Sequence, residues 1–233
     1  MTMKIVMCSL MLSTAAPGFA EAATQQYSVT NFDTVRMQAP FHVTIVTGQG
    51  NSARGEGERD ALDRVSLSVS GGVLTIRASR SRVGQENGNP GKVSLIITTA
   101  TVRRVLMGGN GVLSINGMKG TRGDINMAGN GDLEINGVAL DQLVINSAGS
   151  GRIRLSGSAG DARVQVIGAG NVEAPQLVAK TLTIDSQGPG SIVLTATGTA
   201  DVIVKGSGDV TVRGRPACKT SQAGSGQLIC GSE

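Results

Sequence analysis

The sequence predicts an all-β protein that folds as a parallel β-solenoid (β-helix) with about 18–20 residues per coil. The first observation behind this prediction is a Gly-X-Gly triplet that recurs at a nearly constant interval. The second is that apolar and polar residues alternate between the triplets, which is the pattern of β-strands. The third is the scarcity of aromatic residues: there is no Trp, and no aromatic residue follows Phe41, so any later core must be aliphatic.

The triplets are the strongest signal. They recur at intervals of 20, 20, 19, 20, 18 and 18 residues, which is typical of a repeat architecture. A single Gly-X-Gly is common by chance, whereas seven in near-constant register are not. They begin at Gly109, Gly129, Gly149, Gly168, Gly188, Gly206 and Gly224.

Each repeat contains two strand-like segments. In the segment after Gly131, Leu133 and Ile135 point to one side, and Asp132 and Glu134 point to the other. Alignment of all repeats places aliphatic residues in columns, as expected when each coil stacks on the previous one at about 4.8 Å. Because the period within each segment is two, a helical solenoid is excluded.

The glycines are expected to form the corners of the coils, because glycine reaches positive φ at little cost and has no Cβ to clash between stacked coils. A second corner is expected at Asn116-Gly117, Asn136-Gly137 and Ser156-Gly157. The triplets are not phosphate loops, since no GxxxxGK[ST] motif occurs and no helix follows. Calcium is not expected either. Asp132 and Asp209 follow a second glycine, but other coils place Val112 or Arg152 there.

The chain is expected to have two parts. Residues 1–23 resemble a signal peptide, with Lys4 before an apolar run and small residues that suit cleavage after Ala20 or Ala23. A retained anchor is the alternative. Residues 24–233 are predicted to form one solenoid domain, with irregular coils or a cap over 30–108 and regular coils over 109–233. No segment after the signal peptide is expected to cross a membrane.

Two cysteines remain after removal of the signal peptide. Cys218 and Cys230 fall on inward columns, one strand apart in the last coils. An exported protein permits a disulfide between them, and we predict that this bond staples the C-terminal end. Two buried free thiols are the alternative.

The sequence offers little for catalysis, metals or cofactors. His42 is the only histidine and is expected to face solvent, so neither a Ser-His-Asp site nor a zinc site can be assembled around it. We therefore expect no catalytic residue, no metal and no cofactor. The net charge of +4 is modest and the arginines are scattered, so nucleic acid is not expected as a partner.

The outward columns contain the candidate binding face, which comprises Asp132, Glu134, Arg152 and Arg154. A polysaccharide-cleaving β-helix enzyme is the alternative, because such enzymes use clustered carboxylates, or a metal with a basic residue, in a groove. Asp124, Asp141 and Arg163 would extend the set of candidates. A solvated charged face is the commoner explanation, and the chain lacks aromatic residues on which sugars could stack.

The order of segments resembles a bacterial family, the head GIN domain of auto-transporter adhesins, whose function is not assigned. The resemblance is carried by Phe32-Asp33-Thr34-Val35, Phe41-His42-Val43-Thr44-Ile45, Gly72-Val73-Leu74-Thr75-Ile76 and the Gly-X-Gly coils, over approximately residues 30–230. It implies an exported, right-handed β-solenoid with no assigned catalytic residues.

These observations favour an exported, non-enzymatic module of the bacterial periplasm or cell surface. Its partner would be an unidentified cell-surface polymer or protein. A third hypothesis is a scaffold that self-associates end to end.

Overall fold

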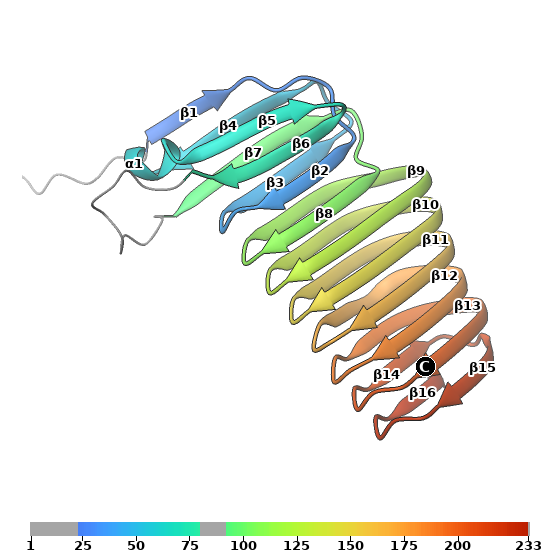
Figure 1. Cartoon of the computed structure of the whole chain (residues 1–233). Coiled ribbons are helices and arrows are strands. Elements are labelled where there is room, and N and C mark those ends of the chain that lie inside the picture. The colour runs from blue at the N-terminus through green and yellow to red at the C-terminus, as the bar shows by residue number, and fades with distance from the viewer. Residues whose placement is uncertain (1–22, 80–91, 233) are drawn as a thin grey trace, which may run out of the picture.

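The protein forms a parallel β-solenoid, which confirms the predicted fold class (Figure 1). The computed structural model describes residues 23–79 and 92–232. The predicted signal peptide lies outside the described residues except for Ala23, which begins strand β1.

The regular coils are built from five long strands. Each pairs in parallel with the strand one coil before it, so backbone groups are satisfied along the stack. Shorter strands complete the last coils. The strands are β9 (Val112–Gly129), β10 (Asp132–Gly149), β11 (Arg152–Ile167), β12 (Asn171–Gln187), β13 (Ile192–Val204), β14 (Val210–Arg213), β15 (Ala217–Gln222) and β16 (Leu228–Ser232).

The strand register confirms the predicted columns. Leu133 of β10 pairs with Leu113 of β9 and with Ile153 of β11. All three side chains are buried. We call the layer formed by residues 112–116 and their register partners sheet 1, and the layer formed by residues 122–128 and their partners sheet 2.

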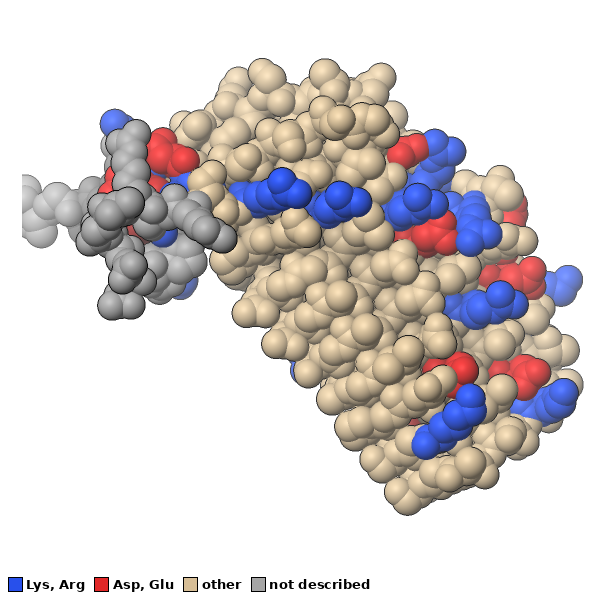
Figure 2. Space-filling view, in the orientation of Figure 1, with Lys and Arg blue, Asp and Glu red and all other residues tan. Residues whose placement is uncertain are grey.

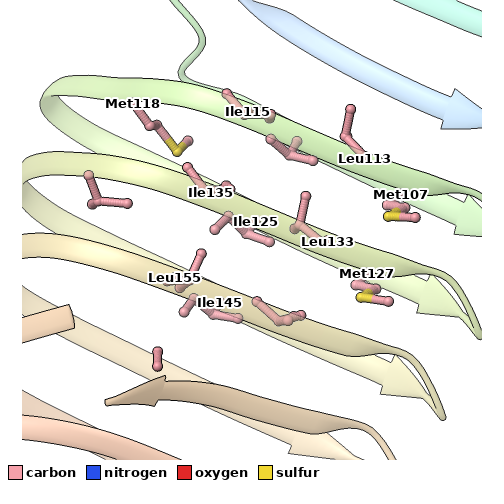
Figure 3. Packing of buried hydrophobic residues seen from close by; sticks show 14 of the residues in the cluster. Met107, Leu113, Ile115, Met118, Ile125, Met127, Leu133, Ile135, Ile145 and Leu155 are labelled. Atoms are coloured by element: carbon pink, nitrogen blue, oxygen red, sulfur yellow. The ribbon is translucent and has the colours of Figure 1, made fainter. Parts of the chain in front are cut away.

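Methionines fill the core near the glycine corners (Figure 3). A Cβ at Gly131 would lie 2.5 Å from the carbonyl oxygen of Gly111, and one at Gly151 would lie 2.6 Å from that of Gly131, besides meeting Cε of Met107 or Met127. The second glycine of these triplets is therefore required by close packing. The first glycine has the predicted conformational role, since Gly129 adopts a φ of 132°.

The N-terminal part contains parallel strands whose spatial order differs from their order in the chain. Strand β2 pairs in parallel with β6 and β8, and β3 pairs in parallel with β7 and β9. The coil made by β2 and β3 is therefore inserted between the coil of β6 and β7 and the coil of β8 and β9. The strands are β2 (Thr34–Gln38), β3 (His42–Thr47), β6 (Val73–Ala78), β7 (Val93–Thr99) and β8 (Arg104–Gly109).

Antiparallel strands and a short helix close the N-terminal end. Strand β4 pairs with β7, β1 pairs with β4, and β5 pairs with β6. Helix α1 buries Leu62, whose carbonyl accepts a hydrogen bond of 3.1 Å from the Tyr27 hydroxyl. This partly buried position raises the pKa of Tyr27, with a smaller contribution from the charge of Asp63. The elements are β1 (Ala23–Tyr27), β4 (Ser52–Gly57), α1 (Arg59–Leu62) and β5 (Val65–Ser70).

A disulfide joins Cys218 and Cys230 at the C-terminal end, which confirms the predicted pairing. The two Cα atoms are 6.3 Å apart. Cys218 pairs in register with Ala200 and so lies in an inward column. Cys218 is nevertheless exposed, because no further coil of the described chain covers it. The bond therefore links strands β15 and β16 across the open end of the core.

Substitution of Gly190 tests whether close stacking sets the stability. A Cβ at Gly190 would lie 2.0 Å from the carbonyl oxygen of Gly170, so Gly190→Ala must push two coils apart. We expect a loss of about 1–3 kcal/mol or more in unfolding free energy, measured by urea denaturation. Gly50→Ala is the control, since nothing lies within 4 Å of its added Cβ. Equal stability of the two variants would contradict this account.

Removal of the disulfide tests its role as an end staple. The cysteines are separated by 12 residues, for which loop-closure entropy gives about 3 kcal/mol. In the double variant C218S/C230S we expect faster amide hydrogen exchange in β15 and β16, with β10 and β11 unchanged, because solenoid coils interact mainly with their neighbours. Unchanged exchange in β15 and β16 would show that the bond does not stabilise this end.

Candidate functional site

The structure brings the four predicted residues of the candidate binding face together on sheet 1. Asp132 pairs in register with Arg152, and Glu134 pairs with Arg154. The stacking of β11 on β10 therefore places opposite charges one strand apart in two adjacent columns. Asp132 and Arg152 approach to 3.8 Å between carboxylate oxygen and guanidinium nitrogen.

Glu173 of β12 completes this cluster and was missing from the predicted face. Its carboxylate oxygens lie 3.3 Å from Nε of Arg152 and 3.4 Å from Nε of Arg154. Register pairs Glu173 with Arg154, so the column reads Glu134, Arg154, Glu173. The segment GAGNVEA carried the necessary signal, because alignment on its glycines places Glu173 in the same outward column as Glu134.

The charged side chains remain accessible to water. Asp132, Arg152, Arg154 and Glu173 are between 41% and 46% exposed. Ion pairs with this exposure contribute little to stability, usually less than about 1 kcal/mol each. The cluster can therefore exchange its internal contacts for contacts with a ligand at modest cost.

A shallow depression of about 470 Å³ lies beside these residues. Most of its lining side chains are planar amides, carboxylates and guanidinium groups, which donate and accept hydrogen bonds in fixed directions. The depression is lined by Glu134, Asn136, Arg154, Leu155, Ser156, Glu173, Pro175 and Gln176. Ser156 donates a hydrogen bond of 3.0 Å to Asn136, and Asn136 donates one of 2.8 Å to Glu134.

A second charged cluster lies where sheet 2 meets the N-terminal coils. Arg103 forms an ion pair with Asp33, and Arg122 contacts Asp124 at 3.0 Å. Arg104 approaches the same Asp124 at 3.5 Å. Depressions of about 280 and 350 Å³ border the Asp33–Arg103 pair. Of these residues, only Asp124 was a predicted site candidate, and Asp33 was named only within the segment that carries the family resemblance.

The ion pairs of this second cluster change the acidity of its groups. Hydrogen bonds from Arg103 hold the pKa of Asp33 below its ordinary value of 3.8. The hydrogen bonds of Arg122 to Asp124 raise the pKa of Arg122. Asp33 and Arg122 are thus charged at neutral pH.

Other candidate chemistry finds no support in the described ranges. His42 is exposed on sheet 1, with Val112 and Ser94 as its register partners. Within residues 23–79 and 92–232, no three His, Cys, Asp or Glu side chains are grouped so that they could hold a metal ion. No helix in those ranges has the length and hydropathy needed to span a bilayer.

Comparison with known proteins places the chain in a family. A family model described as "Putative auto-transporter adhesin, head GIN domain" matches residues 31–216. The chain belongs to this family. The match covers the inserted coil, the regular coils as far as strand β14, and both charged clusters of this GIN domain. A comparison with curated proteins gave no match.

Solved structures share the fold of this GIN domain. A putative adhesin from Bacteroides fragilis NCTC 9343 superposes with a TM-score of 0.80 at 24% identity, covering 90% of this chain and 96% of that one. From Parabacteroides distasonis ATCC 8503, a putative adhesin gives a TM-score of 0.68 at 18% identity, covering 90% and 97% of the two chains. A putative lipid binding protein of the same organism gives 0.67 at 21% identity, covering 90% and 96%. At these identities the likeness concerns the fold.

The acidity of Asp33 yields a test of the second cluster. The pKa of Asp33 is lower in the folded protein than in the unfolded chain. Such a carboxylate contributes its full stabilisation at pH values above the unfolded-state pKa, and this contribution is lost as the pH falls through the folded-state pKa. Asp33→Asn should therefore lower the melting temperature at pH 7, by an amount corresponding to at most about 1 kcal/mol. The difference from the wild type should shrink below the ordinary pKa of 3.8. A difference that is independent of pH would contradict the ion-pair explanation.

Proposed function

We propose that this GIN domain is an exported, non-enzymatic binding module of the bacterial cell envelope and that it binds a glycan at the depression on sheet 1. The observation that carries the proposal is the set of planar polar side chains around this depression, held on stacked strands. The family description and the names of two structural relatives as adhesins support a binding role. The disulfide is consistent with an oxidising compartment outside the cytoplasm.

The exposure of the charged groups favours binding over catalysis. Enzymes that cleave glycosidic bonds hold their reacting groups in a cleft that is shielded from bulk solvent. Here the side chain of Glu173 is 42% exposed and the depression is shallow. Arg152 and Arg154 approach Glu173 from two neighbouring columns, which is an arrangement that orients a ligand at the surface.

The lining also indicates a hydroxyl-rich ligand. Glu134, Asn136 and Gln176 present acceptors or donors that suit sugar hydroxyl groups. Leu155 and Pro175 are the apolar lining residues, which is too little apolar surface for an acyl chain. The lipid-binding name of one relative therefore does not extend to this depression.

A glycan array tests the proposal with two matched double variants. E134Q/R154Q removes one acid and one base at the depression, and D161N/R163Q removes the same charges from exposed positions of sheet 2. We expect the first variant to weaken binding of the glycans recognised by the wild type by about 10–100-fold, through loss of charge-assisted hydrogen bonds. The second variant should bind like the wild type.

Two results would contradict this proposal. One is equal binding by both variants, which would place the ligand elsewhere. The other is release of reducing ends or unsaturated sugars from a recognised glycan by the purified protein, abolished by E134Q. That second result would establish the polysaccharide-cleaving alternative.

A further inference from the structure

A row of arginines crosses sheet 2 in the N-terminal half of the molecule, where Figure 2 shows a line of Lys and Arg side chains. We call this set the arginine row. All four of its residues are exposed. The arginine row comprises Arg77 of β6, Arg36 of β2, Arg104 of β8 and Arg122 of β9.

The row follows from the strand register. Arg104 pairs with Thr34, and Arg36 lies two residues beyond Thr34 on the neighbouring strand. Gln38, two residues beyond Arg36, pairs with Arg77 on the next strand.

The same step recurs on the other side of Arg104. Its partner there is Asp124, and Arg122 lies two residues before Asp124. Each arginine therefore lies on the strand next to that of the following arginine and is displaced from it by two residues along the strand. With a strand spacing of about 4.8 Å and a rise of about 3.3 Å per residue, the step is about 8 Å and the row spans about 25 Å.

Few acids accompany the row. Among the described residues, neither Arg36 nor Arg77 has an ion pair with a carboxylate. Thr75 and Leu106 flank Arg36 in register, and Arg77 donates a hydrogen bond of 3.0 Å to the amide oxygen of Gln38. Asp124 is shared by the two arginines at the other end. The row therefore keeps a net positive charge at neutral pH.

We infer that the arginine row binds a linear acidic polysaccharide, one carboxylate or sulfate group to each guanidinium. The regular line of charges fits a chain with regularly spaced anions, and guanidinium groups bind such anions in a bidentate manner. An anionic bilayer would instead favour a spread of charges with exposed apolar side chains between them. The exposed large hydrophobic residues of the described chain, Ile96, Ile167, Val178 and Ile229, all lie off the row.

This site is distinct from the depression on sheet 1 and stands on different residues. The depression is lined by two acids, one base and neutral polar groups, and it suits neutral hydroxyl groups. The arginine row selects ligands by charge, so its affinity must fall as salt rises. The two surfaces can therefore be tested independently.

The test compares two triple variants of the same charge. R36Q/R77Q/R104Q removes three charges of the row, while R59Q/K119Q/R213Q removes three exposed charges outside it. The probes are sodium polygalacturonate, neutral dextran and vesicles of phosphatidylglycerol. We expect the wild type to bind polygalacturonate but not dextran, and the row variant to bind polygalacturonate about 100-fold more weakly at low salt. The control variant should lose less than about fivefold, since its charges lie outside the contact.

Salt dependence and single substitutions sharpen the result. The plot of log affinity against log salt concentration has a negative slope. In the row variant this slope should be shallower by about 2, because three ionic contacts are lost. If circular dichroism shows that the row variant does not fold, the single variant R36Q takes its place. Its affinity for polygalacturonate should be about fivefold lower than that of the wild type. Three outcomes would overturn the inference: no binding of polygalacturonate by the wild type, equal loss in both triple variants, or binding of phosphatidylglycerol vesicles without binding of polygalacturonate.

Discussion

The close stacking of one coil on another at the glycine corners is the constraint on which the rest of the structure depends. A Cβ at Gly190 or Gly208 would lie 2.0 Å or less from a carbonyl oxygen of the coil before it. Any other residue there would separate the coils beyond the strand spacing and break the parallel ladders. The inward columns can be filled by side chains of different size and polarity, because Met127, Ser147 and Val166 occupy one column in three successive coils. The corners tolerate far less.

That constraint also determines how surface chemistry is built. Since each coil repeats the backbone of the last, an outward residue has register neighbours about 4.8 Å above and below it. A substitution in one coil therefore also changes the surroundings of the residues above and below it in the same column. The ladder of Glu134, Arg154 and Glu173 arises in this way, as does the hydrogen bond of 3.0 Å between Asn126 and Asn146. The fold fixes where side chains stand, and the residues in each column determine what they bind.

Periodicity explains which parts of this structure could be predicted from the sequence. The columns of Leu133 and Ile145, the pairing of Cys218 with Cys230 and the proximity of Asp132 to Arg152 all depend on a fixed interval between coils. The arginine row could not be found in that way. Arg36 and Arg104 are neighbours only because the coil of β2 and β3 is inserted out of chain order, and no repeat in the sequence records that insertion.

The two ends of the solenoid bear on where partners can bind. At the N-terminal end of the described chain, antiparallel strands and α1 cover the core, so a second molecule would meet antiparallel edges rather than a parallel ladder. At the C-terminal end, strand β15 follows Pro216, carries Lys219 and is tied to β16 by the disulfide. Proline, lysine and covalent closure all oppose the addition of further strands at an edge. End-to-end self-association therefore has less structural support than binding along the sides, where the outward columns of sheet 1 and sheet 2 present regularly spaced polar groups.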